Sequence, residues 1–329
     1  MPLVSLGVPV WNGAKYLHDA LHSIQAQTFR DFEVLISDND STDATREIAE
    51  RFCREDPRFR LVRQPRNIGA SANFNHVFAH TTGALFKWQA YDDVLAPDFL
   101  ERCVGALTTG PGREAVLAYT GTQLIDERAA PLRVYDSATR KGGASASARL
   151  SELIGPGDPR QSLLHMCFPV FGLIRRSALE RTNLIANMPR SDQLLLVELA
   201  LLGSFAEIEA PLFLRREHDD GSVIAAERAA TGPELERRLA AWFDPKRGKR
   251  FPATTTRLGL GYCRAAMTSP LPPREKARAM ARIGGWWRRH ARIIGGEVKI
   301  LARERTAILV AGLRGSRSVC PGSTGSPSG

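Results

Sequence analysis

Two adjacent carboxylates, Asp92 and Asp93, stand directly after an apolar segment of the chain. That segment, residues 84–91, reads as a buried strand, and Pro97 fits the first turn of a helix that follows. Open α/β sheets bind ligands at the carboxyl ends of their strands, so the pair stands where a ligand would bind. Carboxylate oxygens suit Mg²⁺ or Mn²⁺ carrying a diphosphate. Two acids at a helix start are also ordinary capping chemistry, so the pair needs support from the rest of the chain.

Polar residues follow three other apolar segments in the same way. They are Pro9, Trp11 and Asn12 after the first, Asp38 and Asp40 after the second, and Asn67 and Gly69 after the third. A nucleotide base needs a flat apolar partner and an acceptor for its ring NH, which Trp11 and Asp38 can supply. Trp11 could instead be a core aromatic, and residues 38–43 could form a turn and a helix cap. Asn67 and Gly69 suit a tight turn near phosphate or ribose, and Asp40 could simply order its loop.

The first 110 residues alternate expected strands and helices. Strands are expected at residues 4–10, 32–37, 60–63 and 83–91, and helices at 14–27, 42–52 and 71–80. Ser41 or Thr42 is expected to cap the second helix and Ser71 the third. This alternation predicts an α/β fold with a mostly parallel, Rossmann-like sheet flanked by helices. Right-handed crossovers would then place the strand ends on one rim.

The pattern after residue 110 is less regular. A strand is expected at 115–124, a mobile loop or lid at 136–160, and an apolar segment at 170–174. A helix capped by Ser191 should span 191–202, followed by short strands at 205–209 and 212–215. We expect a catalytic domain over 1–230, a basic helical extension over 231–314 and a disordered tail over 315–329.

Bulk composition describes an ordinary globular protein of 329 residues, 43% hydrophobic and 24% charged. Its five cysteines are scattered and form no Cys-x-x-Cys pair, which favours a reducing compartment over disulfides or structural zinc. We see no signal peptide and no apolar run of the roughly 18 residues that a membrane span needs. The expected location is the cytoplasm, with peripheral binding to the inner face of the cell membrane as an option.

The net charge of +10 is concentrated in the C-terminal quarter, where residues 241–329 carry 18 Lys/Arg and 4 Asp/Glu. Between residues 274 and 313, arginines and lysines alternate with aliphatic and aromatic residues. Such a mixture is typical of an interfacial helix on anionic lipid, but also of helices packed on a core with a solvated basic face. Nucleic acid would fit the charge, but no recognisable module accompanies it, so it is not an expected partner.

Taken together, the strand-end residues resemble the nucleotide-sugar-binding half of the family 2 glycosyltransferases, which have the GT-A fold. The resemblance covers about residues 3–225 and is strongest over 4–100. It continues through Phe171-Gly172, Ser191-Asp192-Gln193 and the segment from Arg215 to His218. The chain departs from the family at Ala90, where the common form has an additional aspartate. This departure leaves open which of Asp92 and Asp93 would ligate a metal.

The resemblance implies a role for each matched residue. Asp93, with Asp92, would bind Mg²⁺ or Mn²⁺, and Asp92 would contact ribose. Asp192 would be the general base of an inverting transfer, and His218 would lie near the diphosphate. The nucleotide-sugar-binding set it implies is Pro9, Trp11, Asn12, Asp38, Asp40, Asn67, Asp92 and His218.

The sequence therefore predicts a metal-dependent, inverting glycosyltransferase of hexosyltransferase type, acting in cell-wall or polysaccharide biosynthesis. Its partners would be a nucleotide-diphospho-sugar donor, a glycan or lipid-linked acceptor and an optional anionic membrane surface. A nucleotidyltransferase would share the layout, but residues 9–14 lack the Gly-rich, basic phosphate loop that such enzymes usually have. A non-catalytic nucleotide-sugar-binding protein remains the third alternative, because of Ala90.

Overall fold

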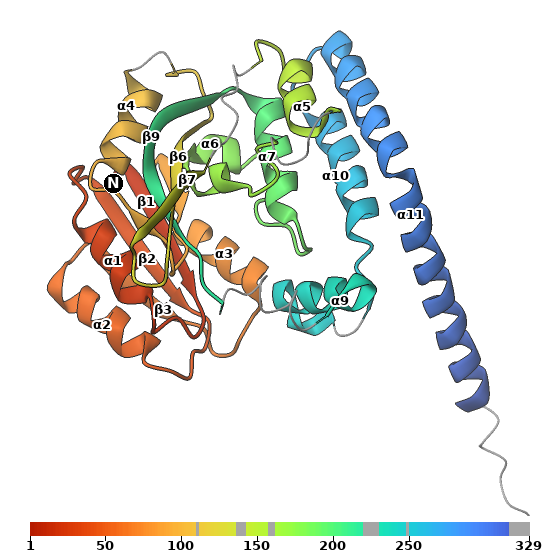
Figure 1. The fold of residues 1–329 in the computed structure, drawn as a ribbon, viewed down its shortest axis with the longest axis horizontal. Coiled ribbons are helices and arrows are strands. Elements are labelled where there is room, and N and C mark those ends of the chain that lie inside the picture. Colours follow the sequence, from red (N-terminus) through yellow and green to blue (C-terminus); the bar gives the residue numbers. More distant parts are fainter. Residues whose placement is uncertain (110–111, 136–142, 157–161, 220–229, 248–249, 316–329) are drawn as a thin grey trace, which may run out of the picture.

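The structure is a computed structural model that describes residues 1–109, 112–135, 143–156, 162–219, 230–247 and 250–315, with side chains up to residue 306. A sheet with the strand order β3-β2-β1-β4-β8-β6-β9-β5 runs through its middle, and β7 pairs with β6 beside this path (Figure 1). The strands are β1 Val4–Val10, β2 Phe32–Asp38, β3 Phe59–Arg63, β4 Leu85–Trp88, β5 Val94–Leu95, β6 Leu117–Ile125, β7 Pro131–Tyr135, β8 Leu173–Arg175 and β9 Phe205–Arg216.

The first half of the sheet is parallel, as expected for βαβ units. β1 pairs in parallel with both β2 and β4, and β2 pairs in parallel with β3. β8 then runs antiparallel to β4 and β6, while β9 runs parallel to β6 and antiparallel to β5. The expected α/β fold is confirmed, with a parallel half joined to a mixed half.

Helices cover both faces of the sheet. They are α1 Leu17–Gln25, α2 Thr45–Glu55, α3 Ala70–Ala79, α4 Phe99–Thr108, α5 Ala146–Ile154, α6 Arg176–Leu179, α7 Ser191–Leu202, α9 Gly232–Phe243, α10 Thr254–Thr268 and α11 Pro273–Gly315, with 3-10 turns η2 Phe168–Phe171 and η3 Pro245–Arg247. Side chains alternate across each strand, so one core takes Val4, Leu6 and Val8 with α1, α2 and α4. The other takes Phe86 and Trp88 with α3, α5 and α7.

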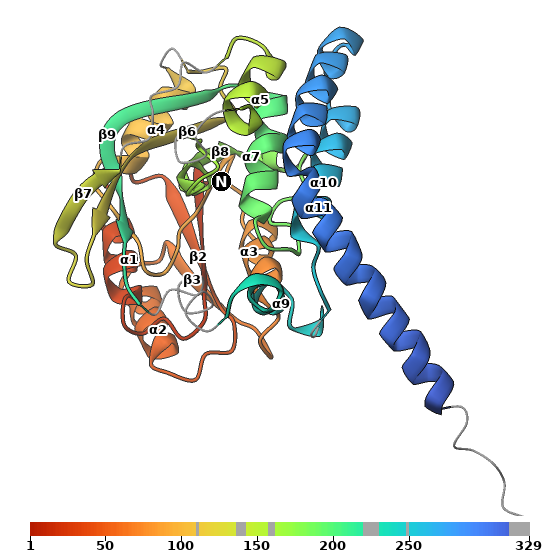
Figure 2. The ribbon, with the colours of Figure 1, turned by 45° about the vertical axis from the view of Figure 1, so that its right-hand side comes forward.

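The second core continues into the C-terminal helices. Tyr262 of α10 and Ile283 and Trp286 of α11 are buried in the same cluster as α7. α10 and α11 form an outer layer beside α5 and α7, and α11 runs on past the body of the molecule (Figure 2). None of the helices in the part that the structure describes is both long and apolar enough to cross a membrane.

Several local expectations were wrong. The 136–160 segment, expected to be a loop, contains α5, whose N-terminus is capped by the Ser145 hydroxyl; residues 136–142 and 157–161 lie outside the described part. The two short strands expected at 205–209 and 212–215 are one strand, β9, whose register shifts at its middle. The apolar segment 170–174 divides between η2 and β8.

The expected helix starts were also wrong. α2 begins at Thr45, whose backbone N–H donates to Asp43, while the Ser41 hydroxyl accepts from the Asn12 N–H. The Ser71 hydroxyl donates to Ile185 O instead of capping α3. Ser191 does not cap α7, which follows Arg190. Pro97 lies in a turn before α4, which begins at Phe99. For Ser41 and Ser71, a partner distant in sequence takes the hydroxyl that local chemistry assigned to a cap.

Candidate active site

The loops after β1, β2 and β4 meet at one edge of the sheet. Val10 is the register partner of Asp38, and the Asn39 N–H donates to Val10 O at 2.9 Å. The loop after β1 also lies against the loop after β4, because a Cβ at Gly13 would meet the Tyr91 ring at 2.7 Å. Adjacent parallel strands place their carboxyl ends together. The structure therefore brings Trp11, Asp38 and the Asp92–Asp93 pair to the same rim.

Asp38 has an acceptor oxygen with no protein partner. Its side chain is fully buried, and its Oδ1 accepts from the Ser41 N–H at 3.0 Å. Its Oδ2 is buried and has no hydrogen-bond donor in the described part of the chain. A buried acceptor without a donor is costly, so this oxygen is suited to receive an N–H from a ligand.

Trp11 is 46% exposed, so its indole is a surface aromatic and not part of the core. Pro9 is buried within β1, opposite Ser37 of β2. Asp40 has a positive φ of 65° and lies 3.6 Å from the guanidinium of Arg63. Of the rim residues after β1 and β2, the indole of Trp11 is thus the one presented to solvent as a flat apolar surface.

Asn12 and Asn67 hold the rim loops in shape. Asn12 has a positive φ of 50°, and its side-chain oxygen accepts from the Thr42 N–H at 2.9 Å. The Asn67 side-chain oxygen accepts from Asn39 Nδ2 at 3.1 Å and from the Gly69 N–H at 2.9 Å. These bonds occupy both amide oxygens, which leaves only the amide nitrogens for a ligand.

Asp92 and Asp93 have different partners. Asp92 Oδ2 accepts from His218 Nε2 at 2.9 Å. Asp93 Oδ1 accepts from Arg215 Nη1 and from the Arg216 N–H, each at 3.0 Å, while its Oδ2 is buried and has no described partner. Arg215 Nη1 also lies 3.8 Å from Asp92 Oδ2. Residues 122 to 126 positions apart in the chain thus form one acid–base cluster.

The end of β9 is held against α1 by Arg216. Its guanidinium is fully buried, donates to Asp92 O at 2.9 Å and to Asp19 Oδ2 at 3.0 Å, and stacks 4.8 Å from the Tyr16 ring. The Tyr16 ring also lies 4.5 Å from the His218 ring. These contacts place His218 beside Asp92.

The surroundings shift the pKa values of Asp92 and Asp93 in opposite directions. Burial raises the pKa of Asp93 to about 6, against the opposing charge of Arg215. Burial also acts to raise the pKa of Asp92, but the His218 hydrogen bond and the charge of Arg215 outweigh it and lower that pKa. Asp93 is therefore the carboxyl that more readily takes a proton.

The carboxylate oxygens of Asp92 and Asp93 suit a hard divalent cation that takes few of its ligands from the protein. The pair offers carboxylate oxygens, one of which, Asp93 Oδ2, is buried without a partner. Across the described residues, no three His, Cys, Asp or Glu side chains converge on a point that could hold a metal. A cation at this rim would therefore take most of its ligands from a diphosphate and water.

Asp192 belongs to a separate cluster, which makes no described hydrogen bond or ion pair with Asp38, Asp92, Asp93 or His218. It lies in the first turn of α7, where its Oδ1 accepts from the Gln193 N–H at 2.8 Å. The Cys167 thiol lies within hydrogen-bonding reach of this carboxylate and also of Leu164 O, at 3.4 Å. Burial raises the pKa of Asp192, and the Gln193 N–H and the thiol act in the opposite direction. A carboxylate with a raised pKa is a stronger base once ionised.

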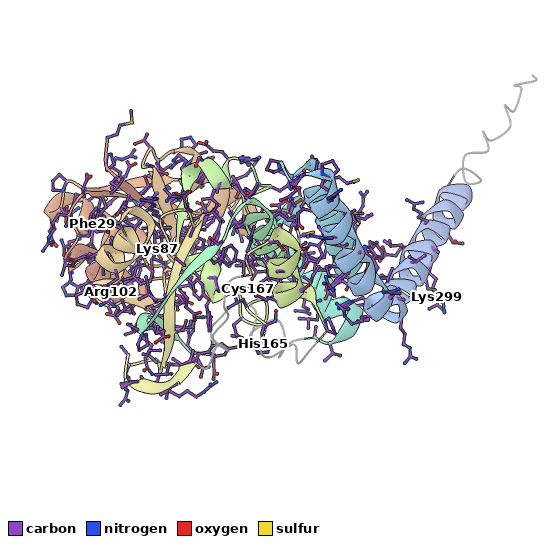
Figure 3. The ribbon with its side chains drawn as sticks, turned by 90° about the horizontal axis from the view of Figure 1, so that it is seen from above. Phe29, Lys87, Arg102, His165, Cys167 and Lys299 are labelled. Atoms are coloured by element: carbon purple, nitrogen blue, oxygen red, sulfur yellow. The ribbon has the colours of Figure 1, made fainter. Side chains whose placement is uncertain are left out.

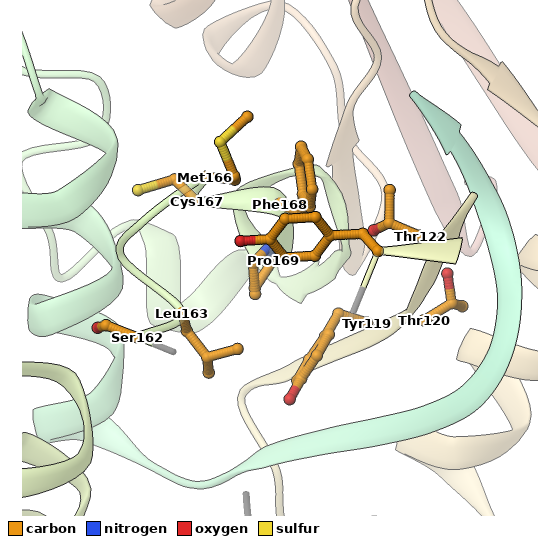
Figure 4. A pocket seen from close by; sticks show the side chains of 10 residues that line it. Tyr119, Thr120, Thr122, Ser162, Leu163, Met166, Cys167, Phe168 and Pro169 are labelled. Carbon is orange, nitrogen blue, oxygen red and sulfur yellow. The ribbon is translucent and has the colours of Figure 1, made fainter. Parts of the chain in front are cut away.

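A pocket opens beside Cys167 (Figure 4). It is lined by Tyr119, Thr120, Thr122, Tyr135, Ser162, Leu163, Met166, Cys167, Phe168 and Pro169. The Tyr135 and Phe168 rings meet edge to face at 5.0 Å. Aromatic faces combined with hydroxyl groups can bind the apolar faces and the hydroxyls of a sugar.

A buried lysine joins β4 to η2, the 3-10 turn whose Phe168 and Pro169 line this pocket. Lys87 of β4 is fully buried and donates to Trp88 O at 3.1 Å and to Phe171 O at the end of η2. Its ammonium lies 4.9 Å from the Phe99 ring centroid and 5.4 Å from that of Phe213. It sits in the sheet, whereas Cys167 lies toward the helical side (Figure 3).

Sequence reasoning did not assign Lys87, Cys167 or Arg215 to the site. A lysine within an otherwise apolar strand was a detectable signal for Lys87, because a buried charge needs partners. No sequence signal identifies Cys167, which contacts Asp192 only because η2 packs against α7. Arg215 stands next to Arg216 and His218, and the sequence alone does not say which of the three faces the carboxylates.

Comparisons with known proteins identify the family of this chain. The model of the family described as "Glycosyl transferase family 2" matches residues 5–182. A Rickettsia prowazekii protein named as an uncharacterized glycosyltransferase is 30% identical over 170 residues, which are 50% of this chain and 49% of that protein. The chondroitin synthase of Pasteurella multocida is 35% identical over 104 residues, 32% of this chain and 11% of its own length. The chain spans about half the length of the first curated relatives it matches.

A solved structure has a similar fold. S. aureus TarS 1-349 in complex with UDP-GlcNAc has a TM-score of 0.59 and 16% sequence identity, covering 86% of this chain and 72% of that one. At this identity the likeness establishes the fold alone. The family model covers more than half of the chain and includes the strands that carry Trp11, Asp38, Asp92 and Asp93, so the chain belongs to glycosyl transferase family 2.

Proposed function

We propose that this protein transfers a sugar from a nucleotide-diphospho-sugar to an acceptor hydroxyl. The observation that supports this most strongly is the rim itself. An exposed indole, a buried carboxylate oxygen without a donor and an acid pair lie at the carboxyl ends of adjacent parallel strands. The indole suits the face of the nucleotide base, the carboxylate oxygen suits the ring NH of that base, and the acid pair suits the diphosphate with its cation.

The base is proposed to bind between Trp11 and Asp38. The indole of Trp11 supplies the stacking surface, and Asp38 Oδ2 accepts the ring NH. Asn12 and Asn67 act by ordering the two loops, as their hydrogen bonds indicate. Pro9 and Asp40 complete the rim beside them. The UDP-GlcNAc named with TarS makes a uridine nucleotide the first candidate to test.

The diphosphate is proposed to bind at Asp92, Asp93 and His218. Mg²⁺ or Mn²⁺, when bound there, would neutralise negative charge on the departing diphosphate. Asp93 is the proposed ligand, because its Oδ2 is free of protein donors, and Asp92 is held toward His218 and the ribose. The single charge of Arg215 offsets part of the negative charge of the two carboxyls.

Asp192 is the proposed general base. It takes the proton of the acceptor hydroxyl while that oxygen attacks the anomeric carbon, and the nucleoside diphosphate leaves from the opposite side. This single displacement inverts the configuration at the anomeric carbon. Its raised pKa supports the role, because proton abstraction is more favourable to a stronger base.

The acceptor is proposed to be a glycan, free or lipid-linked, bound in the pocket beside Cys167. The Tyr135–Phe168 pair and the three hydroxyl side chains Thr120, Thr122 and Ser162 suit a sugar ring. The pocket borders the thiol that contacts Asp192, so an acceptor hydroxyl held there is near the proposed base. The name chondroitin synthase given to one relative agrees with a glycan acceptor.

The test is donor turnover by the purified chain with a panel of UDP-, GDP- and dTDP-sugars, with Mn²⁺ and after chelation. We expect one nucleotide class to raise the melting temperature and its sugar donor to be hydrolysed only with the metal present. Asp192→Asn should lower kcat by about 10²–10⁴-fold with little effect on nucleotide binding. Asp98→Asn, which also alters an acid at a helix start, should leave kcat unchanged.

Three outcomes would contradict the proposal. Full turnover by Asp192→Asn would remove that residue as the base. Tight nucleotide binding without turnover of any donor would favour a non-catalytic binding protein. Release of pyrophosphate from a nucleoside triphosphate and a sugar phosphate would favour a nucleotidyltransferase.

A further inference from the structure

The long C-terminal helix α11 separates its charges onto opposite sides. Its three described carboxylates are engaged with the rest of the protein. Glu297 accepts from the Thr255 and Thr256 N–H groups, each at 2.8 Å, and Glu304 accepts from Arg237 Nη2 at 2.8 Å. Glu275 pairs with Arg278 and accepts from the Ser147 N–H. All three described carboxylates of α11 thus have partners within the protein.

Five cations of α11 lie on its outer side, whereas Lys276 and Arg289 donate to carbonyl groups of the body of the protein. The positions with a shared orientation are Arg274, Arg288, Arg292, Lys299 and Arg303, which we call the basic face. Around the helix axis, the five positions lie within about 60° of one another. They therefore form one row along the helix. All five are exposed, and none makes an ion pair with a carboxylate in the described part of the chain.

Nothing in the described structure covers the basic face. Small residues stand between its cations, and a Cβ added at Gly284, Gly295 or Gly296 would meet no atom within 4 Å. Two aliphatic side chains flank the row, Ile293 at 55% and Val298 at 53% exposure. Lys299 lies on the part of α11 that extends away from the sheet (Figure 3). The face is therefore open, straight and positively charged.

We propose that the basic face docks the protein on an anionic lipid surface. From Arg274 to Arg303 the row is about 44 Å long, at a rise of about 1.5 Å per residue. A flat layer of anionic headgroups can contact such a row along its whole length, and exposed aliphatic side chains at its margins can enter the interface. The face has no aromatic side chain for stacking on bases, which disfavours single-stranded nucleic acid.

The proposal makes binding electrostatic and specific to this face. The test is co-sedimentation of the full chain with phosphatidylcholine vesicles, with and without about 30 mol% phosphatidylglycerol. Binding should occur only to the anionic vesicles and should weaken by about tenfold or more between about 0.1 and 0.5 M salt. The variant R288E/R292E/K299E/R303E should lose at least about tenfold in binding.

A matched control separates this face from overall charge. The variant R54E/R128E/R133E/R181E makes the same change in net charge at exposed arginines outside α11 and should retain wild-type binding. Both variants should unfold at the wild-type temperature, which shows that any loss is not misfolding. Equal loss in the two variants, or equal binding to neutral vesicles, would overturn the proposal. So would preferential binding of the wild type to a DNA duplex at the same salt concentration, because the face would then serve nucleic acid.

Discussion

At the scale of single residues, neighbouring side chains of the same type acquire different chemistry from their surroundings. Asp92 and Asp93 are identical in sequence terms, yet one is bound to His218 and the other to Arg215 and a backbone N–H. The pKa of Asp92 falls and that of Asp93 rises. This difference supports Asp93 as the proposed metal ligand, which the sequence could not choose on its own.

The Cys167 thiol should tune the proposed base. Its contact with Asp192 acts to lower the pKa of that carboxyl, against the larger effect of burial. Removing the thiol in Cys167→Ala should therefore raise that pKa further. Because the base must be ionised, the acidic limb of kcat/KM against pH should move to higher pH.

Cys53→Ala is the control for this change, since Cys53 lies on α2 and is also a free cysteine. Its pH profile should match that of the wild type. An unchanged acidic limb in Cys167→Ala would mean that the thiol does not act on the ionisation that limits catalysis.

At the scale of elements, Lys87 joins β4 to η2 through its hydrogen bond to Phe171 O. The free-energy cost of burying its charge depends on pH. Burial lowers its pKa to about 7 from an ordinary value of 10.5. Between these values the unfolded chain binds more protons than the folded protein, so the contribution of Lys87 to stability rises with pH. Relative to Lys87→Met, the wild-type free energy of unfolding should increase by about 3–4 kcal/mol from pH 7 to pH 10.

Denaturant unfolding at several pH values measures this difference. Lys299→Met is the control, because Lys299 is exposed on α11, and its difference from wild type should be constant across the same window. A constant difference for Lys87→Met as well would show that the buried amine does not titrate there.

The packing of α3 on β1 requires a residue without a side chain at Gly7. A Cβ at Gly7 would lie 2.4 Å from Val77 Cγ2 and 2.9 Å from Phe86 Cζ, so α3 or β1 would have to move. Gly7→Ala should lower the free energy of unfolding by about 1–3 kcal/mol. Gly105→Ala, in α4 with no atom within 4 Å of the new Cβ, should instead raise it by about 1 kcal/mol. Urea unfolding measures both, and equal effects would contradict the packing argument.

At the scale of the whole molecule, the C-terminal helices α10 and α11 share a core with α3, α5 and α7 of the sheet domain. Glu297 of α11 is buried and accepts the first N–H groups of α10, where the positive end of the helix favours a carboxylate. Glu297→Ala should lower the free energy of unfolding by about 2–3 kcal/mol while keeping one cooperative transition. Circular dichroism and tryptophan fluorescence should report the same midpoint.

Glu50→Ala is the matched control, because its pair with Arg46 is exposed on α2 and should contribute less than about 0.5 kcal/mol. If Glu297→Ala instead separates an early fluorescence change from later loss of the sheet, the C-terminal helices unfold on their own. The 1–230 and 231–314 domain division expected from composition would then describe two folding units.

The periodicity of the first 110 residues was enough to predict strands β1 to β4 and the rim at their carboxyl ends. Burial on both faces makes parallel strands continuous apolar runs that are easy to recognise. The two-residue β5 and the edge strand β7 left no comparable signal, because short or exposed strands lack a clear apolar pattern. The expected caps failed because Ser71 and Ser41 found partners distant in sequence.

The sequence by itself determined the α/β class, the succession of strands β1 to β4 along the chain and the set of residue types that follow them, because hydrophobic periodicity and strand-end chemistry are local properties. The tertiary structure alone decided which charges meet. Arg215 and His218 reach the acid pair across more than 120 residues, Cys167 reaches Asp192, and α11 turns its carboxylates inward and its basic face outward. These pairings depend on how separate elements pack, and the energy of a charge depends on its distance to other charges and its depth from water.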